Sequence, residues 1–169
     1  ACSVAQTALW IAESQMMQAT DEIVGFNLDP LPLKTYTNIH EGNALQMDWN
    51  EVVPADKLDY IMGNPPFIGY SMQTAEQKKD MMGLLLDAKG KPFRLAGKID
   101  YVSGWYYKAA QMIAGRPIRV ALVSTNSITQ GEQVEGLWKD LYDMFGIHID
   151  FAYRTFRWDS EATNMAHVH

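Results

Sequence analysis

A short apolar segment that stops abruptly at two consecutive prolines constrains the fold more than any other feature of the sequence. Residues 58–62 are typical of a strand, and a Gly-Asn-Pro-Pro run follows at once at residues 63–66. Proline lacks the backbone N–H that a strand ladder needs, so the strand must end there. A second segment, residues 119–124, is almost continuously apolar, as buried parallel strands are. Because helical patterns lie between and around the two segments, the sequence predicts an α/β fold with a mostly parallel sheet.

The remaining elements follow from apolar spacing and from the positions of glycine and proline. We expect helices over residues 3–19, 74–87, 101–114 and 133–145, and strands over residues 36–41, 58–62, 119–123 and 147–156, with a further strand beginning at residue 166. The first helix is apolar on more than one side, so we expect it to be buried. Asp100 is expected to cap the third helix and Gly146 to end the fourth.

Composition excludes several classes of protein. The chain is 47% hydrophobic and 20% charged, which is too apolar for a disordered protein. The single cysteine, Cys2, excludes a disulfide framework and a CxxC zinc site and fits a reducing compartment. No apolar run approaches the roughly 20 residues of a membrane helix, and no signal peptide opens the chain, so we expect a cytoplasmic protein. The net charge of −6 argues against the whole chain being a nucleic-acid surface.

Four residues, Asn64-Pro65-Pro66-Phe67, combine groups that could activate an aromatic amine. They follow a strand, and ligands of open α/β sheets bind beyond the carboxyl ends of strands. The Asn64 side-chain oxygen and the Pro65 carbonyl could accept from the two N–H groups of the exocyclic amine of a purine base, while Phe67 could stack on the flat face of that base. Such a site needs no titrating base. An ordinary turn out of a strand would use the same residues, so this alternative stays open.

Further segments of the sequence accompany this tetrapeptide in a fixed order along nearly the whole chain. They are ALW at residues 8–10, HEGNALQMDW at 40–49, IMGNPPFIG at 61–69, AEQK at 75–78, DYV at 100–102, VSTNSITQGEQ at 123–133, FAYRTFRW at 151–158 and HVH at 167–169. In these segments the chain resembles the class I, S-adenosylmethionine-dependent adenine-N6 DNA methyltransferases, whose catalytic motif is (Asn/Asp/Ser)-Pro-Pro-(Phe/Tyr/Trp). More narrowly, it resembles the methyltransferase region of the large type II restriction–modification enzymes of bacteria.

The resemblance implies a reaction and its residues. A flipped adenine would take a methyl group from S-adenosylmethionine beside the catalytic residues Asn64, Pro65, Pro66 and Phe67. Asn43, Ala44 and Asn64 would contact the cofactor, with Asn43 standing where many relatives carry an Asp that accepts from the cofactor's adenine amine. The alternative for Gly42-Asn43 is an ordinary turn. The segment 124–127 would lie near the site without a chemical role.

The family's glycine-rich cofactor loop is absent, since no Gly-x-Gly occurs. We therefore expect a partial Rossmann-like methyltransferase sheet with strands 3, 4, 5, 6 and the start of 7, and without the first two strands. The chain begins in a helical pattern and ends in a strand pattern, so residues 1–169 are expected to be a fragment of a single methyltransferase catalytic domain, without the target recognition domain. Such a fragment should be inactive alone, bind cofactor weakly, and either pair its strand edges in a homo-oligomer or leave strand 3 detached.

Basic residues gather in one part of this acidic chain. Residues 70–98 contain six basic and three acidic side chains, a local net charge of +3. We expect Lys78 and Lys79 to contact DNA phosphates near the flipped adenine, and Trp158 to stack on the base; a solvated helix face and a packing tryptophan are the alternatives. His167 and His169 lack a third ligand, so no metal site is expected.

Two other functions remain open. Protein-glutamine methyltransferases also use Asn-Pro-Pro with an aromatic residue, usually Tyr, whereas this chain has Phe67. A non-catalytic α/β module that serves assembly is the second alternative. A glycine-rich loop encoded upstream and a recognition domain encoded downstream would favour the DNA methyltransferase.

Overall fold

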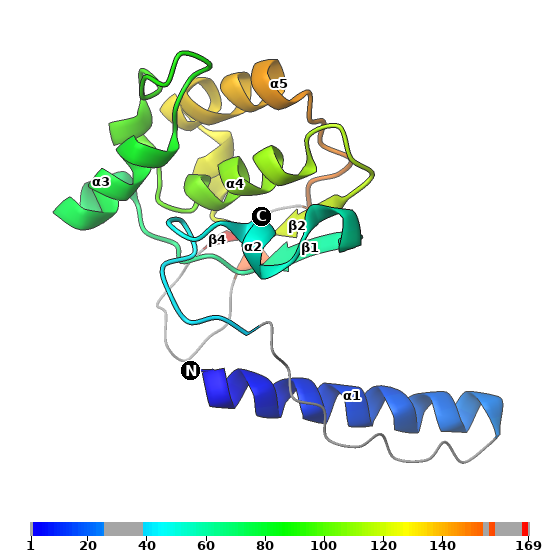
Figure 1. Ribbon diagram of the computed structural model, residues 1–169. Coiled ribbons are helices and arrows are strands. Elements are labelled where there is room, and N and C mark those ends of the chain that lie inside the picture. Colours follow the sequence, from blue (N-terminus) through cyan, green and yellow to red (C-terminus); the bar gives the residue numbers. More distant parts are fainter. Residues whose placement is uncertain (1, 26–38, 154–155, 158–166, 169) are drawn as a thin grey trace.

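The computed structural model describes residues 2–25, 39–153, 156–157 and 167–168 (Figure 1). The helices are α1 (Cys2–Val24), α2 (Trp49–Val52), α3 (Ala75–Leu84), α4 (Ser103–Ile113) and α5 (Lys139–Phe145), and the strands are β1 (Tyr60–Gly63), β2 (Arg119–Leu122), β3 (Phe156–Arg157) and β4 (His167–Val168). A π-helical turn, Val134–Trp138, leads into α5. None of the helices in these ranges combines the length and the apolar character that a bilayer crossing requires.

The two central strands form a small parallel sheet. β1 and β2 pair from Tyr60↔Arg119 to Gly63↔Leu122, with α3 and α4 in the crossover between them. The chain is therefore mixed α/β, as the sequence predicted. Ile61 on one face of this sheet packs with the buried side chains of Met112 and Ile118.

The other face of this sheet is exposed. Tyr60 is 66% exposed and Met62 is 81% exposed, and their neighbours on β2, Arg119 and Ala121, are exposed as well. The prediction that residues 119–124 form a strand buried on both faces was therefore wrong. Because side chains alternate along a strand, the helix layer covers only every second residue.

The largest core lies between α3, α4 and α5. Its fully buried side chains come from all parts of this layer: Met81, Leu85, Ile99, Val102, Ile128, Leu137 and Leu141. Two glycines permit the close packing. A Cβ atom on Gly104 would lie 2.9 Å from Leu45 Cδ1, and one on Gly136 would lie 2.8 Å from Leu95 Cβ. No side chain larger than hydrogen fits at either position without movement of its neighbours.

The first helix differs from its prediction. α1 forms, and it is longer than the predicted 3–19, but it contains no buried residue and Figure 1 shows it set apart from the other helices. Val4 is 73% exposed and Ile23 is 85% exposed. The predicted burial was wrong because apolar periodicity specifies which side chains could be buried, whereas burial itself requires an element that covers them.

The C-terminal strand predictions have mixed outcomes. Residues 147–153 are not in a strand, and Ile149 and Phe151 are 48% and 77% exposed, so the strand predicted over 147–156 was wrong for this part. Alternating apolar residues form a strand only where a neighbour completes the hydrogen-bond ladder. β3 and β4 do pair, antiparallel, in the register Phe156↔Val168, which confirms the strand predicted near the C-terminus.

The N-terminal strand prediction falls mostly outside the described residues, which exclude 26–38. Its last residues, 39–41, are not in a strand. Two helix ends agree with the sequence. Thr74 forms a capping box with Gln77 at the start of α3, and Gly146 adopts φ +61° as the left-handed cap of α5.

Candidate active site

The Asn-Pro-Pro-Phe segment, called here the catalytic loop after the role predicted for it (residues 64–67), begins where β1 ends. Because β1 and β2 are parallel, both strands end at the same edge of the sheet. Val123 N donates to Gly63 O at 3.1 Å, which extends the pairing one step beyond the strands. The loop and the segment after β2 therefore leave the sheet side by side, at the edge where α/β sheets bind ligands.

The four loop residues differ in exposure. Asn64 and Pro66 are exposed, Phe67 is half-buried and Pro65 is buried. Ile68 N donates to Pro66 O at 3.2 Å, so the chain turns tightly just after the prolines. The loop is thus anchored at Pro65 and presents the Asn64 amide to solvent.

Asp100 binds the chain that follows the catalytic loop. It is only 8% exposed, and its Oδ1 accepts from Tyr70 N at 3.0 Å while its Oδ2 accepts from Ser127 Oγ. The neighbouring Tyr101 N donates to Ile68 O at 2.9 Å. The predicted role of Asp100 as a helix cap was wrong: α4 begins at Ser103 without a side-chain cap, and the Asp100 carboxylate bonds to residues distant in sequence.

The strand-end segment predicted near the site is also firmly held. Ser124 is 1% exposed and accepts from the Tyr106 hydroxyl at 3.1 Å, and the same hydroxyl lies 3.3 Å from Leu122 O. Burial raises the pKa of Tyr106, and the hydrogen bond with Ser124 offsets part of this shift. Tyr106 therefore stays a neutral donor that ties α4 to the carboxyl end of β2.

The turn that carries Asn43 and Ala44 is fixed from two directions. Asn43 Nδ2 donates to Asp80 Oδ2 at 2.8 Å, and Asn43 Oδ1 accepts from Leu45 N at 3.0 Å. Because a carboxylate only accepts hydrogen bonds, the Asn43 amide must turn its NH2 group towards Asp80 and its oxygen towards Leu45 N. Asn43 is exposed, and its Oδ1 retains a second lone pair with which it can accept. Ala44 is half-buried and accepts from Trp49 Nε1 at 2.8 Å.

Asp80 itself is a polar centre that sequence reasoning missed. It accepts from Asn43, from Gln46 Nε2 at 2.8 Å and from the Tyr101 hydroxyl at 3.2 Å. Burial acts to raise the pKa of Asp80, but the hydrogen bonds from Gln46, Asn43 and Tyr101 outweigh it, so this pKa lies below its ordinary value. Burial and the Asp80 charge raise the pKa of Tyr101, which keeps its hydroxyl protonated. The only sequence signal was an acidic residue within a basic segment.

A cavity of about 490 Å³ lies on the other side of this turn, beside α2 and α4. Lys108 lines it and donates to Leu45 O and Met47 O, with its ammonium group 5.6 Å from the Trp49 ring centroid. Burial lowers the pKa of Lys108. The catalytic loop does not line this cavity. Lys108 supports the Asn43 turn through its hydrogen bonds to Leu45 O and Met47 O.

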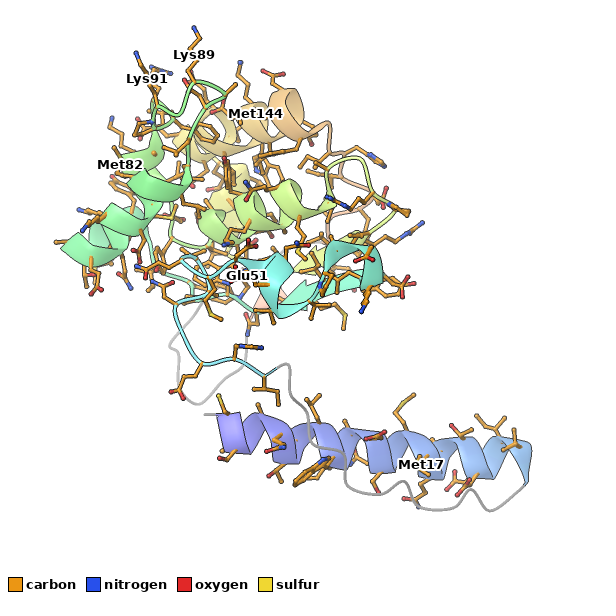
Figure 2. The ribbon with its side chains drawn as sticks, in the orientation of Figure 1. Met17, Glu51, Met82, Lys89, Lys91 and Met144 are labelled. Carbon is orange, nitrogen blue, oxygen red and sulfur yellow. The ribbon has the colours of Figure 1, made fainter. Side chains whose placement is uncertain are left out.

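The basic segment is partly neutralised in the structure. Arg94 pairs with Glu135, and Lys98 Nζ lies 3.2 Å from Glu132 Oε1. Lys78 and Lys79 are exposed on α3. Figure 2 shows Lys89 and Lys91 pointing outward from the loop that follows α3.

Three predicted features depend on the C-terminal residues. Trp158 and His169 lie outside the described residues, and His167 is in β4. Within the part of the chain that the structure describes, no group of three or more His, Cys, Asp or Glu side chains could hold a metal ion.

Parallel strands followed by polar loops at a shared carboxyl edge are the arrangement in which α/β proteins bind ligands. The chain belongs to the family described as MmeI, DNA-methyltransferase domain, which its sequence matches over residues 1–169. This confirms the resemblance to the methyltransferase region of restriction–modification enzymes.

Two relatives support the family assignment. DNA methyltransferase A of Bacillus subtilis (strain 168) is 43% identical over 169 residues, which cover 98% of this chain and 18% of that protein. Among solved structures, the type IIL restriction–modification enzyme MmeI in complex with DNA matches with a TM-score of 0.80 and 45% identity, over 96% of this chain and 21% of that one. The chain thus spans a minor part of the length of both relatives.

Proposed function

We propose that this chain carries the methyl-transfer site of an adenine-N6 DNA methyltransferase that belongs to a restriction–modification protein. The observation that supports this most directly is the position of Asn64-Pro65-Pro66-Phe67. It follows β1 at the edge that β1 shares with β2, with the Asn64 amide exposed. S-adenosylmethionine would supply an electrophilic methyl group at that edge.

The chemistry requires the adenine amine to become a nucleophile. In the proposed mechanism the Asn64 side-chain oxygen and the Pro65 carbonyl accept from the two N–H groups of a flipped adenine, and Phe67 stacks on its face. Positive charge would develop on the amine as the N–C bond formed and the bond from methyl to sulfur broke; S-adenosylhomocysteine would leave, and the extra proton of the methylated amine would pass to solvent. The two oxygens stabilise that charge, while Pro66 keeps the loop in shape.

The cofactor would be held by Asn43, Ala44 and Asn64. The donor and acceptor groups of the turn fit this assignment. The Asp80 carboxylate accepts from Asn43 Nδ2, and Asn43 Oδ1, which already accepts from Leu45 N, keeps a second lone pair with which it can accept. An acceptor is what the amino group of the cofactor's adenine requires. Lys108 and Asp80 hold the turn in place and would not themselves touch the cofactor.

DNA would meet the chain at Lys78 and Lys79, with Trp158 stacking on the extruded base. The net charge of −6 and the ion pairs of Arg94 and Lys98 leave little positive charge for the phosphate backbone. Most of the DNA affinity would therefore come from other parts of the full-length protein.

The size of the chain relative to its relatives supports the proposal that residues 1–169 are a fragment of one Rossmann-like catalytic domain. β1 and β2 would be strands 4 and 5 of the family's sheet. The isolated fragment would then be inactive, would bind S-adenosylmethionine weakly and could form homo-oligomers through its strand edges. We place the full-length protein in the bacterial cytoplasm.

The test uses the full-length protein that contains this chain, with radiolabelled S-adenosylmethionine and unmethylated duplex DNA. The expected product is N6-methyladenine, identified by nucleoside digestion and mass spectrometry. Asn64→Ala should abolish methyl transfer and leave DNA binding nearly unchanged, whereas Gln18→Ala removes an exposed amide on α1 and should retain activity. Wild-type turnover in Asn64→Ala would overturn the mechanism.

Two other products would favour the alternatives. Methyl groups recovered on a glutamine-containing peptide, and not on DNA, would indicate a protein-glutamine methyltransferase. A full-length protein that methylates neither acceptor would indicate an α/β module that serves assembly.

A further inference from the structure

We propose that the dipeptide Asp100-Tyr101 positions both parts of the site: Asp100 orients the catalytic loop, and Tyr101 orients the Asn43 turn through Asp80. The inference rests on the proposed function, because it assigns separate kinetic roles to two residues that would touch neither substrate nor cofactor. Both residues would act by holding other groups in place.

The Asp100 carboxylate joins the two segments that leave the sheet. Its Oδ1 accepts from Tyr70 N, which follows the catalytic loop, and its Oδ2 accepts from Ser127 Oγ, which follows β2. A carboxylate that is 8% exposed is stable in the interior only if its oxygens are hydrogen-bonded, and both oxygens are. Displacement of either segment would leave one oxygen of this buried carboxylate without a hydrogen bond.

Backbone contacts make the dipeptide a rigid support. Tyr101 N donates to Ile68 O at 2.9 Å, and Asp100 N donates to Gln133 Oε1 at 3.1 Å. Gln73 Nε2 donates to Ile99 O at 2.9 Å, just before the dipeptide. The chain on the far side of the catalytic loop is therefore bonded to residues 99–101 at three points: Ile68, Tyr70 and Gln73.

The Tyr101 side chain reaches the other part of the site. Its hydroxyl donates at 3.2 Å to Asp80 Oδ2, the oxygen that also accepts from Asn43 Nδ2 at 2.8 Å. The Tyr101 ring packs edge-on against Trp105, with ring centroids 5.3 Å apart. A continuous path of contacts thus runs from Ile68 through Tyr101 and Asp80 to Asn43.

Loss of the Asp100 carboxylate and loss of the Tyr101 hydroxyl should cause different kinetic defects. Loss of the Asp100 carboxylate would remove the bond at Tyr70 and loosen the chain that follows Phe67, which would lower kcat, since a misplacement of about 1 Å costs on the order of 100-fold in rate. Loss of the Tyr101 hydroxyl would leave the catalytic loop bonded through Tyr101 N and would loosen the Asn43 turn. The expected result is a higher KM for S-adenosylmethionine with little change in kcat.

The experiment compares four variants of the full-length protein in a methyl-transfer assay on duplex DNA. Asp100→Ala should lower kcat by about 100-fold. Asp100→Asn should recover most of that loss, because an amide can accept from Tyr70 N and donate to Ser127 Oγ. Tyr101→Phe should raise the KM for S-adenosylmethionine by about 5–10-fold, as the loss of one hydrogen bond worth about 1 kcal/mol would. Asp87→Ala is the matched control.

Asp87 is a suitable control because its carboxylate also accepts from backbone amides, those of Lys89 and Lys91, but at the surface and outside the site. Asp87→Ala should leave both kcat and KM unchanged. An equal loss in Asp100→Ala and Asp100→Asn, or a Tyr101→Phe variant with unchanged KM, would overturn the proposal.

Amide hydrogen exchange separates this inference from the proposed function. Asp100→Ala should speed exchange across residues 68–73, and Asp87→Ala should not, whether or not the protein methylates DNA. If the wild-type protein fails to methylate DNA but the exchange result holds, the proposed function is wrong and the positioning by Asp100 stands. If exchange across 68–73 is unchanged in Asp100→Ala, the positioning role is wrong.

Discussion

Helices α1 and α4 are both rich in apolar residues, yet α4 is largely buried and α1 is exposed. α4 buries Ser103, Gly104, Tyr107, Ala109, Ala110 and Met112. α1 buries none of its residues. The apolar side chains of α1 are spread around the helix and none is covered, whereas α4 is covered both by the core that it shares with α3 and α5 and by the sheet, where Met112 packs with Ile61 and Ile118.

The difference shows that a helical apolar pattern carries two kinds of information. The spacing of side chains specifies the helix itself, and both helices form where the pattern predicts them. Burial depends in addition on a covering element, and only α4 has one among the described residues. The exposed apolar side chains of α1, among them Ile23 at 85%, thus form a surface whose burial would release a large hydrophobic free energy.

The largest test of this comparison introduces one charge into each helix. Ala110→Glu should abolish folding of the chain, because Ala110 is 3% exposed and a buried carboxylate without a partner costs several kcal/mol. Ala8→Glu on exposed α1 should change the free energy of unfolding by less than about 0.5 kcal/mol. Circular dichroism during urea unfolding measures both. Equal destabilisation by the two variants would show that α1 is covered as α4 is.

A milder test truncates one methionine in each helix. Met112 is 9% exposed and Met16 is 69% exposed. Met112→Ala should lower the free energy of unfolding by about 2 kcal/mol or more, because it leaves a cavity beside Ile118. Met16→Ala should change it by less than about 0.5 kcal/mol. If denaturation midpoints shift equally, the contrast in burial is not real.

The third test removes a cap from α3, the helix that carries Asp80. Thr74→Ala deletes the hydroxyl that accepts from Gln77 N at 3.2 Å and should cost about 1 kcal/mol. Thr74→Ser keeps an accepting hydroxyl and should behave as the wild type. Thermal unfolding of the two variants measures the difference, and a loss in Thr74→Ser as large as that in Thr74→Ala would argue against capping as the cause.

The smallest expected effect is a pH dependence that arises from Asp80. The folded-state pKa of Asp80 lies below its ordinary value, so the stability that this carboxylate contributes is present above that ordinary value. It is lost as the pH falls through the folded-state pKa. The wild type should therefore lose slightly more stability between pH 6 and pH 3 than Asp80→Asn does in parallel urea titrations. Superimposable pH profiles would contradict this contribution.

Sequence patterns located the elements around the site because each depends on nearby residues. The proline run fixed the end of β1, and the spacing of apolar residues gave α4 within a few positions. Asp100 could not be assigned correctly from the same patterns. Its position before a helix suggested a cap, but its partners Tyr70 and Ser127 are 30 and 27 residues away in the sequence. Asp80 was missed for the same reason, since Asn43 is 37 residues away.

Of the predicted site residues, Asn64 lies at the carboxyl edge of the sheet. Asn43 is linked through Asp80 and Tyr101 to Ile68, which directly follows the catalytic loop. The roles of these residues in binding and chemistry stay predictions. The strand predicted over 147–156 failed at residues 147–153 on a different ground: alternation specifies the two faces of a strand, but a ladder needs a neighbouring strand, which no local pattern supplies.

The order of residues along the chain has a consequence for synthesis. The catalytic loop leaves the ribosome before Asp100, and Asp100 before Ser127 and the strand β2 that pairs with β1. At about 5–20 residues per second, the loop waits several seconds for the segments that hold it. A nascent chain arrested before Asp100 would therefore contain every residue of the loop but lack both the hydrogen bonds with Asp100 and Tyr101 and the pairing with β2.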